Sequence, residues 1–156
     1  MVFRDNGWAG LAVAGTHRVS ITTASFTGNG ECGLCFLGDA DGSLTTASFD
    51  GNKVGVAVAE AARPTLMDLT IDGGEVGLQV EGSAAPLVDG ATISSSSRAA
   101  VIVGGKATGA LASVVCKDVD YGIVVTATAA PTLTGNTCAL ARGSIGSPSP
   151  SPSPGG

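Results

Sequence analysis

The sequence predicts an all-β fold, a parallel β-helix in which one chain winds through about six stacked coils of 22–23 residues. Three observations predict it: an internal repeat of nearly constant period, apolar columns at fixed places in that repeat, and a composition rich in Gly and poor in aromatic side chains. The 156 residues are 44% hydrophobic and only 13% charged, which is typical of a chain that buries a core. We therefore expect repeated units that stack around one shared core.

The repeat is clearest in residues 10–32 and 33–54, which both carry the letters TTASF, then Thr or Asp, then Gly-Asn. We number each repeat from the small residue that opens it. The openers are Gly10, Gly33, Gly55, Gly77, Ala100 and Gly122. Successive openers are 23, 22, 22, 23 and 22 residues apart, and a period this regular indicates a solenoid.

Four columns of the repeat hold only apolar residues or Cys. One residue after the opener stand Leu11, Leu34, Val56, Leu78, Val101 and Ile123. Three after it stand Val13, Phe36, Val58, Val80, Val103 and Val125. Eleven after it stand Ile21, Leu44, Leu66, Val88, Leu111 and Leu133. Sixteen after it stand Phe26, Phe49, Ile71, Ile93, Cys116 and Cys138.

The first two columns are separated by a single variable residue, which is the alternation of a strand with one buried face. We expect about three short strands in each coil, each paired in parallel with its equivalent at a spacing of ~4.8 Å. A helical solenoid is disfavoured because Gly, Thr, Ser and Val dominate and no clean 3.6-residue periodicity occurs.

The predicted turns carry residues that suit sharp corners. Gly-Asn pairs occur at 28–29, 51–52 and 135–136, and the first two pairs share one column of the repeat. Gly and Asn tolerate the left-handed backbone that such corners require. Pro64, Pro86 and Pro131 share the column nine after the opener, just before a predicted strand, where the missing N–H is tolerated.

The Gly-aliphatic-x-aliphatic openings, the Gly-Asn corners and the 22–23-residue period resemble the right-handed parallel β-helix repeats of the pectate-lyase-like superfamily and its non-enzymatic relatives. The resemblance covers about residues 1–142 and implies a single-stranded β-helix with right-handed winding. The superfamily hosts lyases, hydrolases, adhesins and sensor domains, so the resemblance implies a fold and no single reaction.

Two parts of the chain are expected: a β-helix domain over residues 1–146 that begins inside a coil, and a Ser-Pro-rich linker or tail over 147–156. The mid-coil start suggests a piece of a longer protein, with Phe3 and Trp8 folding over the edge as the alternative. Uncapped coils also invite end-to-end pairing. The Ser-Pro repeat predicts an extended spacer to an adjoining domain, and a frayed tail is the alternative.

The expected location is extracellular or at the cell surface, as for the bacterial modules whose Ser-Pro linkers this one resembles. The N-terminus shows no signal-peptide pattern, and no apolar run of about 18 residues predicts a membrane span. The net charge of -5 and the scattered basic residues argue against nucleic acid as a partner.

The cysteines allow several interpretations. Cys32 and Cys35 form a C-x-x-C that could be a redox pair or half of a zinc site, but they straddle a coil boundary and lack a strand-to-helix context. All four cysteines cannot meet at one ion, since the pairs lie several coils apart. Cys116 and Cys138 share an inward column, so we expect them to fill space in the core, with a disulfide as the alternative.

The candidate ligand-binding residues are acidic. Asp50 and Asp72 stand seventeen after the opener in adjacent coils and should stack one strand spacing apart, with Asp68 and Asp89 near them. Such a pair could bind a cation such as calcium, which related lyases use, and a solvated turn column is the alternative. His17 is the sole histidine and is expected in a solvated turn, so no Ser-His-Asp set and no catalytic residues are assigned.

Other surface features bear on the function. Trp8 and Tyr121 are the single Trp and Tyr and stand at opposite ends of the repeat, so no long track of stacked rings for a glycan exists. Columns of Ser and Thr ten, twelve and fifteen after the opener resemble the lattice of ice-binding proteins, although Met67, Asp89 and other residues interrupt them.

The sequence therefore predicts a structural or ligand-recognition module of a larger secreted or surface protein, with a polysaccharide as the partner class that the resemblance implies. Catalysis is left open, and a non-enzymatic role is favoured. A fragment of a polysaccharide lyase or hydrolase is the first alternative, and an ice-binding surface is the second.

Overall fold

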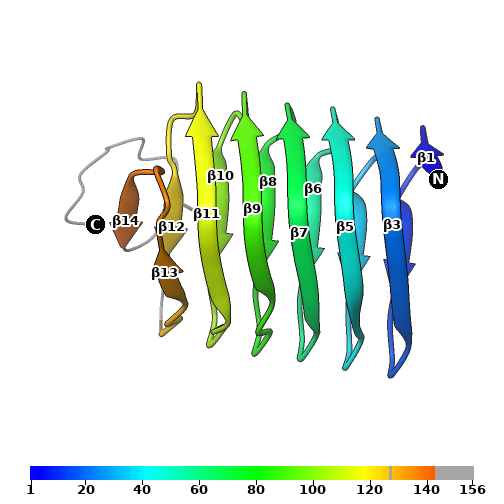
Figure 1. Cartoon of the computed structure of the whole chain (residues 1–156), viewed down its shortest axis with the longest axis horizontal. Coiled ribbons are helices and arrows are strands. Elements are labelled where there is room, and N and C mark those ends of the chain that lie inside the picture. The colour runs from blue at the N-terminus through cyan, green and yellow to red at the C-terminus, as the bar shows by residue number, and fades with distance from the viewer. Residues whose placement is uncertain (127, 143–156) are drawn as a thin grey trace.

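The computed structural model describes residues 1–126 and 128–142. These residues form a stack of coils in which the chain alternates between two parallel sheets (Figure 1). We call one the long-strand sheet. It contains, in order, β1 (Val2–Arg4), β3 (Arg18–Thr27), β5 (Asp41–Asp50), β7 (Arg63–Asp72), β9 (Leu87–Ser94), β11 (Ala110–Lys117) and β13 (Thr132–Thr134). We call the other the short-strand sheet. It contains, in order, β14 (Leu140–Arg142), β12 (Ile123–Val125), β10 (Ala99–Val103), β8 (Val76–Val80), β6 (Val54–Val58), β4 (Cys32–Phe36) and β2 (Ala9–Val13).

The strand register confirms the repeat and its period. Leu34 pairs with Leu11 in the preceding coil and with Val56 in the following coil, so residues of one sequence column are partners in the sheet. Strands that are equivalent in the repeat are neighbours in space, and they pair in parallel in both sheets. The described residues contain no helix long and apolar enough to cross a bilayer.

The expectation of three short strands per coil is wrong in one respect. The second and third predicted strands are continuous in the structure and make one strand of eight to ten residues in each of β3, β5, β7, β9 and β11. A residue with left-handed backbone interrupts each long strand thirteen after the opener. These residues are Thr23, Thr46, Asp68, Gly90 and Ser113, with φ values between 53° and 84°. The pairing skips this column, so the alternation of inward and outward side chains shifts there by one residue.

The core lies between the two sheets and contains the four predicted columns, together with a fifth column fourteen after the opener that was not predicted: Ala24, Ala47, Leu69, Ala91 and Val114. Leu34, Leu44 and Val56 have no exposed surface, because each is covered by its equivalents above and below as well as by the opposite sheet. Phe3, Phe26 and Phe49 stack face to face, with ring centroids 4.9 and 4.7 Å apart. Identical positions therefore stack directly, which is how a chain with 4% aromatic residues fills its interior.

The Gly-Asn corners contribute a buried hydrogen-bond ladder. Gly28 and Gly51 have left-handed backbone, with φ of 64° and 67°, and the next residues, Asn29 and Asn52, turn their side chains inward. Asn29 Nδ2 donates to Asn52 Oδ1 over 2.8 Å, and Asn6 Nδ2 donates to Asn29 Oδ1 over 2.9 Å. The asparagines thus satisfy buried polar groups at the corner, since each also bonds to main-chain atoms.

All four cysteines form disulfides, which corrects the expectation that Cys116 and Cys138 are space-filling thiols. Their bridge joins adjacent coils, with the Cα atoms 5.1 Å apart. In-register stacking at one strand spacing brings two cysteines of one column within bonding reach. Cys32 and Cys35 form the second bridge, and both residues lie within β4. Neither pair therefore supplies thiolates for a zinc ion.

The N-terminal residues complete a coil as expected. Phe3 pairs in register with Phe26, and Ala9 pairs with Cys32. The predicted linker at 147–156 and the last residues of the predicted domain, 143–146, lie outside the described residues.

Candidate functional site

The four predicted acidic residues lie on the outer side of the long-strand sheet but do not gather at one point. Asp50 and Asp72 are register partners at the ends of β5 and β7, as predicted. Ser94 Oγ donates to Asp72 Oδ1 over 3.1 Å and continues the same column. Asp68 and Asp89 lie at the middle of β7 and β9, four to five residues earlier along the strands, which corresponds to roughly 13 Å.

Among the described residues, no third carboxylate, imidazole or thiolate joins the pair formed by Asp50 and Asp72. Within residues 1–126 and 128–142, no three His, Cys, Asp or Glu side chains form a group that could hold a metal ion. Calcium binding at Asp50 and Asp72 therefore stays a prediction. His17 lies exposed in the turn before β3, where its Nδ1–H donates to the Ala14 carbonyl oxygen over 2.8 Å, as expected for a turn residue.

A shallow polar depression lies at the start of β3, β5 and β7. Arg18 donates two hydrogen bonds to Asp41, of 2.7 and 2.9 Å, in a bidentate pair between adjacent coils. These hydrogen bonds lower the pKa of Asp41 and raise the pKa of Arg18. Arg63 continues the column, and Ser43 lies beside it in the lining of the depression. The Arg18–Asp41 pair is largely neutralised, so it is a surface link between coils.

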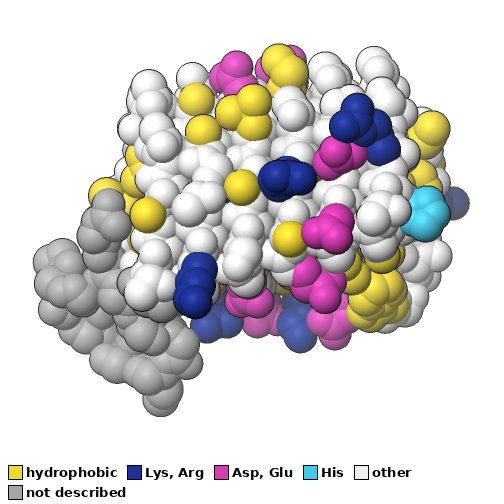
Figure 2. Space-filling model, turned by 90° about the horizontal axis from the view of Figure 1, so that it is seen from below, with side chains coloured by type: hydrophobic (Ala, Val, Ile, Leu, Met, Phe, Trp, Pro, Cys, Tyr) yellow, Lys and Arg dark blue, Asp and Glu magenta, His cyan; other side chains and the backbone are white. Residues whose placement is uncertain are grey.

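The hydroxyl columns also face outward on this sheet. Ser20 and Ser43 Oγ atoms lie 3.3 Å apart, but exposed Met67 and Leu87 interrupt the columns further along. The left-handed residues separate the column twelve after the opener from the column fifteen after it. Figure 2 shows the molecule from below relative to Figure 1, and on this side charged side chains of both signs are interspersed with uncharged surface.

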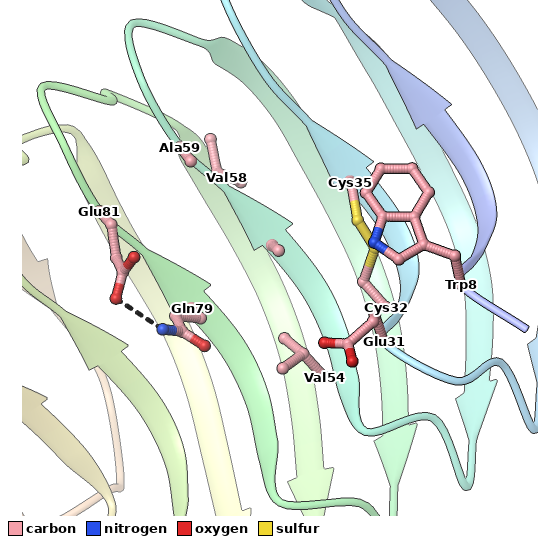
Figure 3. A pocket seen from close by; sticks show the side chains of 10 residues that line it. Trp8, Glu31, Cys32, Cys35, Val54, Val58, Ala59, Gln79 and Glu81 are labelled. Atoms are coloured by element: carbon pink, nitrogen blue, oxygen red, sulfur yellow. Dashed lines mark hydrogen bonds between the residues drawn. A yellow bond between two sulfur atoms is a disulfide. The ribbon is translucent and has the colours of Figure 1, made fainter. Parts of the chain in front are cut away.

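A hollow of about 210 Å³ with an aromatic wall lies on the outer side of the short-strand sheet (Figure 3). We call it the Trp8 hollow. Its lining comprises Trp8, Glu31, Cys32, Cys35, Val54, Ala57, Val58, Ala59, Gln79 and Glu81. The residues come from the segment before β2 and from β4, β6 and β8 with their flanking turns, so three consecutive coils build it.

The floor of the hollow follows from a difference in side-chain size along one column. Ala57 lies between Cys35 on one side and Gln79 on the other, in register with both. Ala57 carries only a methyl group, so it leaves a depression between the Cys32–Cys35 disulfide on one side and the longer Gln79 side chain on the other. The Cys32–Cys35 disulfide and the Trp8 side chain both line one end of the hollow (Figure 3).

Trp8 is held in place through its main chain. Its carbonyl oxygen accepts hydrogen bonds from the N–H groups of Glu31 and Cys32, over 2.6 and 3.2 Å. The side chain nevertheless remains 54% exposed, the largest aromatic surface the described chain presents to solvent. An exposed indole with a fixed backbone is a platform on which a flat apolar face can stack.

The opposite end of the hollow is polar. Gln79 Nε2 donates to Glu81 Oε1 over 2.6 Å, which orients both side chains, as Figure 3 shows. At the Trp8 end, Glu31 Oε2 lies 3.7 Å from Lys53 Nζ, and both side chains are about half exposed. The hollow therefore combines an aromatic wall, an apolar floor and hydrogen-bonding groups at its rim, which is the composition of a small-ligand site.

Comparison with known proteins bears on the fold. Residues 1–138 match the family described as the right-handed beta helix region. The chain belongs to the right-handed β-helix family. No curated protein and no solved structure matches the chain significantly. The family match supplies the right-handed winding, which agrees with the handedness that the resemblance implied.

In this right-handed β-helix, sequence reasoning missed the Trp8 hollow. Two signals pointed to it. Gln79 is the one polar residue in a column otherwise occupied by Ala, Cys, Ile and Val, and Trp8 stands two residues before the first opener, in register with Glu31. Neither signal is specific, because the depression depends on the short side chain of Ala57 between two longer ones.

Proposed function

We propose that this β-helix is a ligand-recognition module that binds carbohydrate in the Trp8 hollow. The proposal rests on the exposed indole of Trp8 at one end of the hollow and the hydrogen-bonded Gln79–Glu81 pair at the other end. A sugar ring has an apolar face that stacks on an aromatic ring and an edge of hydroxyls that pairs with amides and carboxylates. The hollow offers both surfaces at once.

The size of the hollow limits the ligand. Its volume of about 210 Å³ lies below the ~300–1,000 Å³ that is usual for drug-sized ligands. A single sugar ring, or the end of a glycan chain, therefore suits it better than a long polymer lying across many coils. This accords with the absence of a row of aromatic platforms on the described surface.

The two disulfides support a location outside the cytosol, at a cell surface or in an extracellular medium. Disulfides persist in oxidising compartments and are rare where glutathione keeps thiols reduced. A role as one module of a larger secreted or surface protein is part of the same proposal.

A glycan-array screen tests the proposal, run on the wild type and on Trp8→Ala, with and without calcium. The expected result is binding by the wild type that Trp8→Ala weakens at least ~10-fold, since loss of a central aromatic anchor costs about 2 kcal/mol or more. Leu87→Ala is the matched control, because Leu87 is similarly exposed, at 48%, but lies on the long-strand sheet.

The outcomes separate the candidate functions. Binding that Trp8→Ala leaves intact would overturn the assignment of the hollow. Cleavage of a bound glycan, especially in the presence of calcium, would favour the lyase or hydrolase alternative and direct attention to Asp50 and Asp72. A change in ice-crystal shape without glycan binding would favour the hydroxyl columns of the long-strand sheet.

A further inference from the structure

We propose that the Trp8 hollow selects a sugar that carries a free ammonium group, such as a glucosamine residue, over its neutral and acidic counterparts. This inference rests on the proposed carbohydrate function and adds the chemical class of the sugar. Its basis is the charge of the hollow. The charged side chains among its lining residues, Glu31 and Glu81, are both carboxylates, and they stand at opposite rims.

Glu81 is positioned to accept a further hydrogen bond. Its Oε1 is occupied by the amide of Gln79 over 2.6 Å, which fixes the carboxylate. Within residues 1–126 and 128–142, this carboxylate makes no other hydrogen bond or ion pair. An ammonium group on a ring carbon can donate to the second oxygen with the geometry of a charge-assisted hydrogen bond.

Glu31 adds a second negative charge beside the aromatic platform. Lys53 Nζ is 3.7 Å from its Oε2, but the two side chains are 47% and 53% exposed, so this ion pair is weak and readily rearranged. The Trp8 indole beside Glu31 also attracts a cation through its ring face. A carboxylate or sulfate on the ligand would instead meet two like charges.

The floor does not offset this charge. Val54, Ala57 and the Cys32–Cys35 disulfide are uncharged, and the arginines Arg18 and Arg63 line the separate depression on the long-strand sheet. The negative charges of Glu31 and Glu81 at the rim are therefore not balanced by any charge on the floor of the hollow, and they attract a cationic ligand. The selection should weaken as salt increases, because the carboxylates are exposed and the screening length is about 10 Å at 0.1 M.

The test compares three β-1,4-linked trisaccharides that differ only at the second carbon of each ring: glucosamine, N-acetylglucosamine and glucose. Isothermal titration calorimetry at pH 6 in low salt measures each affinity. We expect the glucosamine trisaccharide to bind about 5- to 50-fold more tightly than the glucose trisaccharide, from two exposed ion pairs and one cation–π contact.

Charge-neutralising variants locate the effect. Glu81→Gln and Glu31→Gln should each reduce the preference for glucosamine about 2- to 5-fold, and the double variant should remove most of it. Asp120→Asn is the matched control, because it changes the net charge equally but lies outside the hollow, three or more coils away from Glu31. A preference that follows net charge alone would also fall in this control.

The outcomes distinguish the two proposals. Equal affinity for all three trisaccharides would overturn the ammonium selectivity and leave carbohydrate binding in place. A preference that the double variant keeps would also overturn it, since another site would then supply the selectivity. No binding of any of the three trisaccharides, or of any glycan on the array, would overturn both proposals.

Discussion

Replacing Asn29 with Ala should destabilise the β-helix strongly, because this side chain is the middle member of the buried asparagine ladder. Asn29 is only 2% exposed. Its Nδ2 donates to Asn52 Oδ1 over 2.8 Å and to the Phe3 carbonyl oxygen over 3.2 Å. Its Oδ1 accepts from the side chain and the main-chain N–H of Asn6, over 2.9 and 3.2 Å.

The magnitude follows from these four contacts. A typical intramolecular hydrogen bond contributes about 1 kcal/mol net, and a buried polar partner that is left unpaired costs about 1–3 kcal/mol. Water can reach the Asn6 side of the ladder, since Asn6 is exposed, so the full sum is not expected. We predict a decrease of about 3 kcal/mol in the free energy of unfolding for Asn29→Ala.

Urea denaturation followed by far-UV circular dichroism measures this change. Ser48→Ala is the control, because Ser48 is an exposed hydroxyl on β5 and should change the stability by no more than about 0.5 kcal/mol. The slope of the transition should stay the same, which would show that the unfolded state is unaffected. A loss below about 1 kcal/mol for Asn29→Ala would refute the structural role given to the ladder.

Three further predictions concern the cross-links and the backbone. Cys138→Ala should lower the free energy of unfolding by about 3 kcal/mol in non-reducing urea denaturation, because the lost bridge closes a loop with a sequence separation of 22 residues; an unchanged transition midpoint would contradict the bridge. Asp41→Asn should cause a small loss of stability at pH 7, because Arg18 holds the folded-state pKa of Asp41 below the ordinary value of 3.8. The contribution is present above that ordinary value and disappears as the pH falls through the lowered pKa, so the difference in melting temperature between wild type and variant should shrink as the pH is lowered below 3.8, and a difference that stays constant would point to another cause. Ser113→Gly should raise the stability by about 0.5 kcal/mol, because Ser113 has a left-handed φ of 57° that costs a side-chain residue more than the added chain entropy of Gly; Ser48→Gly, in an ordinary strand conformation, should lower it.

The fold could be predicted from the sequence because equivalent residues make the same packing contacts in every coil of a solenoid. Leu34 must match Leu11 above it and Val56 below it, so the apolar columns, the period and the register all contain the same information. The N-terminal match of Phe3 with Phe26 followed from the same rule. The handedness came from the family and not from the columns, since a left-handed winding can stack the same residues.

The internal detail of each coil was harder to predict. Thr23 and Thr46 take the left-handed conformation in mid-strand, although Thr is β-branched and disfavours it, whereas Asp68 belongs to a residue type that tolerates it. The other local signals are Gly90 and Gly135 in the same column of later coils. At the Gly-Asn corners, the sequence predicts only that Gly and Asn tolerate a left-handed backbone. The structure assigns the left-handed conformation to Gly51 and a buried hydrogen-bonding role to Asn52.

The site was the least predictable part. Asp50 and Asp72 share a column, and the structure places them as register partners, but their role as ligand-binding residues stays a prediction. The Trp8 hollow depends on which side chains are short, which are long and which point outward at a coil boundary. These differences in side-chain length and direction matter only where three coils meet, so the sequence of a single coil does not predict the hollow.

The intrinsic fluorescence of the protein reports directly on ligand binding at the Trp8 hollow, because Trp8 is its single tryptophan and forms a wall of the proposed site. The chain should be titrated with the tightest-binding glycan from the array while calorimetry measures the same binding. If the glycan binds in the Trp8 hollow, the Trp8 emission should change and then saturate as glycan is added. The dissociation constant from this titration should equal the one that calorimetry gives. Calorimetric binding that leaves the emission unchanged would place the ligand elsewhere and contradict the account.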